Sequence, residues 1–203
     1  MSENLSREDR LSIEGRYYEA IKNWSKAVEV YHTLWNFAPD NLDYGLRLAQ
    51  AQTSGTLNKD AMATLELLRN LPAPASEDPR IDLAEIVAVH EQSEFKRELA
   101  AALRATEKGQ KLGARLLVAR AEMGQARAYY DLGDVQQFQK AAETSRQIYA
   151  EAGDLRGRSP GLARFGNRSL RTRRFSGRTK EPARSSRYLP QDRQSTMRER
   201  RAE

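Results

Sequence analysis

Small and apolar residues between positions 8 and 37 recur one helical turn apart, in two groups that a polar stretch separates. The first group is Gly15 and Tyr18, and the second is Ala27, Tyr31 and Leu34. Residues three or four apart share one face of a helix, so each group marks the buried face of one helix. Pro39 follows the second group, and proline cannot continue a helix. The pattern therefore predicts two packed helices over residues 8–37.

The same pattern returns 34 residues further along the chain. The shifted positions are Ala49, Gln52, Ala61, Leu65 and Leu68. All but Gln52 keep a small or apolar side chain, and Pro72 and Pro74 follow where a second pair would end. We therefore predict a second helix pair over residues 42–71, with its turn at residues 54–56. One pair cannot bury its own apolar face, so the repetition predicts helix pairs stacked in a row.

A third helix pair is predicted over residues 77–113. Pro79 and the acidic residues before it suit the start of a helix, where proline and negative charge are both favoured. Residues 93–95 suit the turn between its two helices. Glu98 stands where the pattern places a small residue, which leaves the register of this pair open.

A fourth helix pair is predicted over residues 114–154, with its turn at residues 132–135. Phe138 is larger than the small residue that the pattern favours at its position. The helix over residues 136–151 presents a strip that a fifth pair would cover. The strip consists of Ala142, Ser145, Ile148 and Tyr149. Such a strip favours association when it is left in water, so we expect self-association through this uncapped C-terminal repeat.

The intervals in these pairs resemble those of the tetratricopeptide repeat (TPR), a helix–turn–helix unit of about 34 residues. The segments EGRYYEA, LWNFAPDNLDYGLRLAQAQ, TLELLRNLPAPASEDPRIDLAE and GARLLVARAE are similar to repeats that follow a Ser/Thr kinase or winged-helix domain in bacterial signalling proteins. The resemblance covers residues 8–154. It implies an all-α, right-handed superhelix of about four helix pairs that serves as a partner-binding or regulatory module. It does not imply kinase activity, because the kinase motifs for phosphate, metal and catalysis are missing from the sequence.

The resemblance also implies a site, because TPR arrays bind peptides in a concave groove lined by the first helix of each pair. The residues expected to face this groove are Arg16, Glu19, Gln50, Thr53, Arg120, Arg127 and Tyr130. They suit an extended acidic or mixed-charge segment of a partner protein, and ordinary surface is the alternative. The expected function is therefore that of a protein–protein interaction scaffold and not that of an enzyme.

No catalytic, cofactor-binding or metal site is expected. His32 and His90 are the only histidines, and a metal site needs three or four convergent ligands. A run of carboxylates lies near the start of the third pair. It comprises Glu77, Asp78, Asp82 and Glu85. Paired carboxylates can act as acid and base, but helix capping and the helix dipole explain this run more simply.

The amino-acid composition bears on the cellular compartment in which the protein is expected. The chain of 203 residues has no cysteine, which excludes disulfides and thiolate metal sites and is compatible with a reducing compartment. Its first residues have no apolar core of the kind that secretory signals carry. No apolar run approaches the roughly 20 residues that a membrane span needs. We therefore expect a cytoplasmic protein with no membrane partner.

The basic residues concentrate at the end of the chain. Residues 155–203 contain 14 Arg, 1 Lys and 4 acidic residues, a net charge of +11, whereas residues 1–154 carry −5. Arginine here has no helical or strand period and is interleaved with Ser, Gly and Pro, so the composition predicts disorder. One interpretation is a basic arm that binds nucleic acid through phosphate contacts, with Phe165, Phe175 and Tyr188 stacking on bases. A nucleic-acid-associated protein is thus the alternative function.

The genetic code offers a second interpretation of residues 155–203. Arginine codons have G in the middle, so a shift of one base turns them into codons for Ala, Gly, Asp, Glu or Val. A permitted back-translation from Arg158, shifted in this way, contains L-Y-E-Q-G-D-F followed by small and apolar residues at intervals of four and three. We favour this interpretation, in which the tail is a frame-shifted fifth repeat. Nucleic acid is a partner only if the basic tail is genuine.

Overall fold

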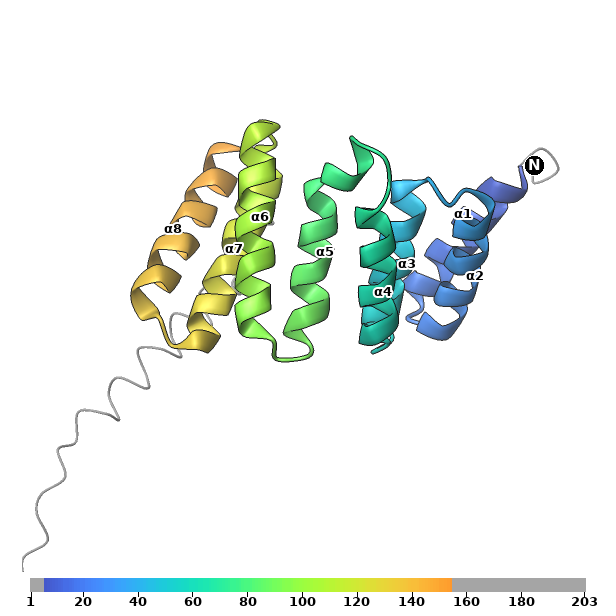
Figure 1. Cartoon of the computed structure of the whole chain (residues 1–203), viewed down its shortest axis with the longest axis horizontal. Coiled ribbons are helices and arrows are strands. Elements are labelled where there is room, and N and C mark those ends of the chain that lie inside the picture. Colours follow the sequence, from blue (N-terminus) through green and yellow to red (C-terminus); the bar gives the residue numbers. More distant parts are fainter. Residues whose placement is uncertain (1–5, 155–203) are drawn as a thin grey trace, which may run out of the picture. The chain divides into compact units, whose positions relative to one another are not determined.

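The computed structural model describes residues 6–154, which form eight α-helices and no strand (Figure 1). The helices are α1 (Arg7–Ala20), α2 (Trp24–Phe37), α3 (Leu42–Ser54), α4 (Asn58–Arg69), α5 (Pro79–His90), α6 (Phe95–Lys111), α7 (Arg115–Leu132) and α8 (Val135–Glu151), and a short 3₁₀ turn, η1 (Ala75–Glu77), precedes α5. Each helix packs against the next in the chain, so the helices form four consecutive pairs. The predicted all-α class and the four pairs are confirmed. Both interpretations of residues 155–203 concern positions outside the described range.

Five of the helices begin directly after a short polar side chain. A side-chain oxygen accepts a backbone N–H of the first turn in five helices of the described range. These capping residues are Ser6, Asn23, Asn41, Asp78 and Asp134. Such caps satisfy amide groups that have no partner inside the helix. None of the helices in residues 6–154 is long and apolar enough to cross a membrane.

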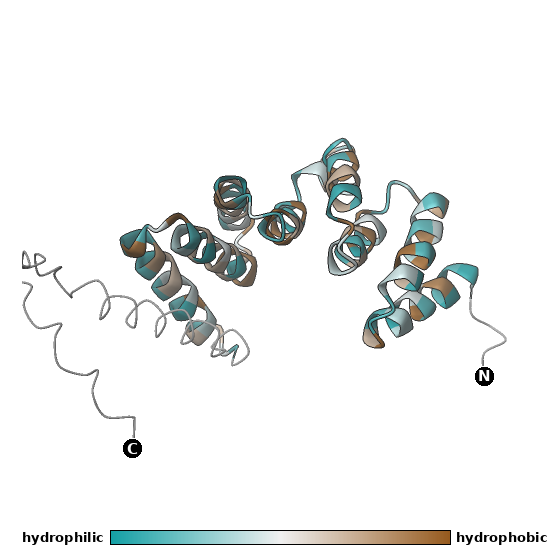
Figure 2. Ribbon diagram, turned by 90° about the horizontal axis from the view of Figure 1, so that it is seen from below, coloured by the Kyte–Doolittle hydropathy of each residue, from teal (hydrophilic) through white to brown (hydrophobic). Residues whose placement is uncertain are grey.

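The buried core includes the positions that the 34-residue interval picks out on α2 and α4. Ala27, Tyr31 and Leu34 are fully buried together with Leu48 and Ala51 of α3. The shifted residues on α4 lie in a second cluster with side chains of α5. This cluster includes Ala61, Leu65, Leu68, Ile81 and Ala88. Each cluster joins one helix pair to the next, and Figure 2 shows that the helices carry both apolar and polar positions. The stacking of pairs therefore buries faces that a single pair would leave in water.

Glycine sets the distance between α1 and α2. A Cβ atom on Gly15 would press on Cε1 of Tyr31 and lie 2.7 Å from Cζ of the same ring. Gly45 on α3 stands in the same relation to Leu68 on α4, since a Cβ there would meet the leucine side chain. In both pairs, a large side chain of the second helix therefore packs directly on the backbone of the first.

The C-terminal helix buries more of its surface than the sequence indicated. Ser145 and Tyr149 are both buried. Ser145 Oγ donates a hydrogen bond of 2.7 Å to the backbone oxygen of Ala119 on α7. Phe138 fits in spite of its size, since its ring packs edge-on against Tyr130 at a centroid distance of 5.6 Å. The prediction that Ser145 and Tyr149 need a fifth pair to cover them is therefore wrong.

The Gly15–Tyr31 contact yields a test of the packing in the first pair. Gly15→Ala is expected to lower the free energy of unfolding, because overpacking costs about 1–3 kcal/mol and exceeds the gain of about 1 kcal/mol in helix propensity. In a Tyr31→Leu background the ring is gone, so the same Gly15→Ala change is expected to stabilise the protein. Urea unfolding of the four variants measures this change of sign. Stabilisation by Gly15→Ala in both backgrounds would contradict the contact.

Candidate functional site

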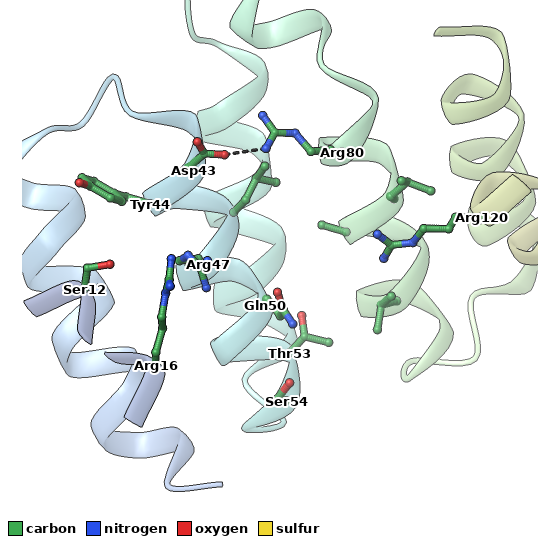
Figure 3. A pocket seen from close by; sticks show the side chains of 14 residues that line it. Ser12, Arg16, Asp43, Tyr44, Arg47, Gln50, Thr53, Ser54, Arg80 and Arg120 are labelled. Atoms are coloured by element: carbon green, nitrogen blue, oxygen red, sulfur yellow. Dashed lines mark hydrogen bonds and ion pairs between the residues drawn. The ribbon is translucent and has the colours of Figure 1, made fainter. Parts of the chain in front are cut away.

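A hollow of about 630 Å³ runs across the first helices of the four pairs (Figure 3). Every residue that lines it belongs to α1, α3, α5 or α7. None of the lining residues comes from α2, α4, α6 or α8. The hollow is therefore a surface that successive helix pairs build together, and no single pair contains it.

The floor of the hollow is apolar and its walls are polar. Leu46 of α3 and the α5 residues Leu83, Ala84 and Val87 supply the apolar part. Val87 is 45% exposed, although it lies on the most buried helix of the described range. Hydroxyl and amide side chains surround this floor. They include Ser12, Tyr44, Gln50, Thr53 and Ser54. A chain lying in the hollow would therefore meet apolar surface and hydrogen-bonding groups at once.

Arginine dominates the electrostatics of the hollow. Arg16, Arg47, Arg80 and Arg120 come one from each lining helix, and Figure 3 shows them around the hollow. Asp43 is the only carboxylate among the lining residues, so the lining carries a net charge of +3. Residues 6–154 as a whole contain 19 basic and 23 acidic residues. The hollow is thus a basic surface on an acidic body.

Two of these arginines have carboxylates close by, and two do not. Arg80 Nη1 lies 2.6 Å from Asp43 Oδ1, and Arg47 Nη1 lies 3.7 Å from Glu19 Oε2. Within residues 6–154, no carboxylate comes within 4 Å of the guanidinium groups of Arg16 and Arg120. Both side chains are exposed. They are the arginines best placed to receive a carboxylate from outside.

The structure brings together four of the seven residues predicted for the groove. Arg16, Gln50, Thr53 and Arg120 line the hollow. Glu19 lies beside it, as the partner of Arg47.

Arg127 and Tyr130 do not line the hollow. The guanidinium of Arg127 is held by buried Glu98, and the Tyr130 ring packs on Phe138. Helical spacing from the correct residues would have found two further members. Ser12 precedes Arg16 by four residues, and Arg47 precedes Gln50 by three.

Two carboxylates of α5 point away from the hollow into the core. Asp82 is fully buried and Glu85 nearly so. Arg69 at the end of α4 binds both, at 2.8 Å from Asp82 Oδ1 and 2.5 Å from Glu85 Oε2. Three side chains of α6 complete the cluster around these two acids. Arg104 binds both acids, Lys108 binds Asp82 at 3.0 Å, and Arg97 binds Glu85 at 2.9 Å.

This cluster corrects the interpretation of the carboxylate run as a helix cap. Only Asp78 caps α5, through a 2.8 Å hydrogen bond from the Arg80 backbone N–H. Burial by itself raises the pKa of Asp82, but hydrogen bonds from Arg69, Lys108 and Arg104 outweigh it. The net result is a pKa below the usual value of 3.8, so Asp82 is ionised at neutral pH. We assign Asp82 and Glu85 a role in joining α4, α5 and α6.

A second buried cluster surrounds Glu98, whose place in the repeat pattern was open. Glu98 is fully buried, and its carboxylate accepts from Arg127 Nε at 2.6 Å and contacts His90 Nδ1 at 2.9 Å. With Asp131, His90 and Glu98 offer metal-ligand atoms within 4.8 Å of one another. Arg127 already balances the charge of Glu98, so we assign this cluster a structural role. Glu98 lies on α6, at a position where the repeat pattern places a small residue. Its carboxylate is accommodated there because it contacts His90 of α5 and Arg127 of α7.

Comparisons with known proteins name no family for this geometry. The sequence matches no protein-family model, and no curated protein matches it.

The buried carboxylates give the protein a pH dependence that can be measured. Asp82→Asn is expected to lower the free energy of unfolding at pH 7 by about 3 kcal/mol, because it removes the charge of a fully buried carboxylate that Arg69, Arg104 and Lys108 bind. The wild type should lose the contribution of Asp82 as the pH falls below 3.8, since the unfolded chain then binds the proton first. The free energy of unfolding of the Asp82→Asn variant should depend less on pH in this acidic range. Denaturant unfolding between pH 7 and pH 3 measures both effects.

Glu107→Gln provides the matched control for Asp82→Asn. It removes a carboxylate from an exposed pair on α6, in which Lys111 is the partner. Exposed pairs contribute little to stability, so this variant should unfold like the wild type at neutral pH. Equal effects of the two substitutions would contradict the central role of the Asp82 cluster.

Proposed function

We propose that the protein is a non-catalytic scaffold of the TPR type that binds an extended acidic segment of a partner protein in the hollow. One observation carries this proposal: four successive first helices each place an arginine around one apolar floor. An extended segment that crosses these helices meets each arginine in turn. The repeat intervals in the sequence support the TPR type, in which the concave face has this use.

The chemistry of the hollow favours carboxylates over other groups. The guanidinium group is a planar donor that pairs with a carboxylate through two parallel hydrogen bonds. Arg16 and Arg120 stand at α1 and α7, the outermost of the lining helices, and each is exposed. The floor of Leu83, Ala84 and Val87 lies on the helix between them in the chain. A segment with acidic residues on both sides of an apolar residue therefore matches the lining.

The resemblance of the segments to repeats in bacterial signalling proteins supports a cytoplasmic regulatory context for the scaffold. In that context the partner is a protein, and the scaffold positions it without changing it chemically. The alternative, binding of nucleic acid, rests on residues 155–203, which lie outside the described part of the chain. The experiment below separates the two, because it leaves those residues unchanged.

Charge reversal in the hollow tests the proposed function. The probe is a short fluorescein-labelled peptide of glutamate and glycine with one central leucine. Arg16→Glu combined with Arg120→Glu is expected to weaken its binding about tenfold or more, because attraction becomes repulsion at both arginines. Fluorescence anisotropy measures the affinity. A peptide with glutamine in place of glutamate should bind weakly to both proteins.

The control variant combines Lys59→Glu with Lys140→Glu. It changes the net charge by the same amount, but these exposed lysines lie on α4 and α8, which do not line the hollow. It should bind the probe like the wild type. Equal losses in the two variants would mean that only overall charge attracts the peptide. Unchanged binding in the Arg16 and Arg120 variant would show that the acidic segment binds elsewhere, the basic tail included.

A further inference from the structure

Helix α1 has two apolar faces, and only one of them is covered. Leu11 and Tyr18 pack with α2, and Gly15 is buried between them. A second row follows at intervals of four residues, with Ile13 and Tyr17 on α1 and Ile21 directly after its last residue. In this row Ile13 is 56% exposed, Tyr17 57% and Ile21 52%. A row of three large apolar residues, each more than half exposed, is unusual for a surface that faces only water.

The next pair shows what this face does elsewhere in the same molecule. The residue 34 positions after Tyr17 is Ala51, which is fully buried in the cluster with Ala27 and Tyr31. The residue 34 positions after Ile21 is Gly55, where an added Cβ would lie 3.2 Å from Trp24 Cβ. The residue 34 positions after Ile13 is Arg47, which lines the hollow, so on α3 the part of this face at Ala51 and Gly55 packs against α2. On α1 the equivalent face is open.

Two observations argue against another helix pair packing on α1 in the manner of α2. Glu14 of α1 stands where α3 has the buried Leu48, so such packing would bury a carboxylate in an apolar site. The outer side of α8 does not match the row either. Gln139, Glu143 and Arg146 are exposed there, and the last two form an ion pair. End-to-end stacking of α1 on α8 would set apolar residues against these polar ones.

A second α1 does match the row. We propose that two copies of the chain associate through their α1 helices, packed antiparallel about a two-fold axis at Tyr17. The row is symmetric about this residue, so Ile13 of one copy meets Ile21 of the other and the two Tyr17 rings meet at the centre. Glu14 then falls beside Ala20 of the other copy, so no like charges face each other. Such self-complementarity is what a two-fold interface requires, and antiparallel helix dipoles favour it.

The absence of cysteine from the sequence permits a direct test of this geometry. Tyr17→Cys in the full chain is expected to form a disulfide-linked dimer under mild oxidation, because the two-fold axis brings residue 17 of both copies together. Ile13→Cys and Ile21→Cys should each cross-link poorly alone and efficiently when mixed. Gln139→Cys on α8 is the exposed control. Cross-linking of Tyr17→Cys no faster than that of Gln139→Cys would overturn the proposal.

Sedimentation equilibrium over the micromolar range provides an independent measurement. Tyr17→Glu is expected to raise the dissociation constant of the dimer about tenfold or more, because it places two carboxylates at the centre of an apolar contact. Gln139→Glu adds the same charge on α8 and should leave the dimer intact. Circular dichroism of Tyr17→Glu should match the wild type, since Tyr17 is exposed. A monomeric wild type, or a dimer that Tyr17→Glu does not weaken, would overturn the proposal.

Discussion

The arrangement of the four helix pairs depends on two buried carboxylates. Asp82 and Glu85 lie where α4, α5 and α6 meet, and neither acid is stable there without the cations around it. Arg69 is the residue that ties α4 to α5, and with it the first two pairs to the last two. Side chains of α6 hold the same acids from the other side. The junction in the middle of the array thus combines these ion pairs with the apolar cluster of Leu65, Leu68 and Ile81. The junction of the first two pairs is apolar around Ala27 and Leu34.

This ionic junction bears directly on the hollow. Asp82 and Glu85 face the cluster, while their neighbours Leu83 and Ala84 form part of the apolar floor. One short stretch of α5 therefore presents its acids to the core and its small apolar residues to the hollow. Any tilt of α5 that strained the ion pairs would also move the floor. A movement of α5 would therefore change the hollow and the buried ion pairs together.

The sequence alone predicted what depends on local periodicity. Apolar intervals and prolines located the helices, because both act within a few residues of the chain. The same reasoning did not predict the ion pairs of Asp82 and Glu85. Their partners lie on α4 and α6, and a local sequence pattern does not indicate an ion pair between helices. The ion pair of Arg127 was not predicted for the same reason, since Glu98 lies 29 residues earlier in the chain. Spacing on a single helix shows which side chains share a face, but it does not show which other helix packs against that face.

Helix α1 concentrates three different tasks in three consecutive residues. Gly15 admits the Tyr31 ring, Arg16 reaches into the hollow, and Tyr17 points away from both. Successive residues turn by about 100° around a helix, so neighbours in sequence serve different surfaces. A dimer through α1 would join two hollows on one particle, and a partner with two acidic segments would then bind with avidity. In this proposal, one turn of helix would link folding, recognition and assembly.

The contact between Gly15 and Tyr31 has a consequence for evolution. There is no room for even a methyl group on residue 15 while the ring occupies position 31. A descendant with alanine at 15 is therefore expected to carry a smaller side chain than tyrosine at 31, whereas position 31 can become smaller on its own. The same restriction applies to Gly45 and Leu68 in the second pair. Divergent relatives of this protein should be recognisable by the joint pattern of these two couples, even where the remaining residues have drifted beyond recognition.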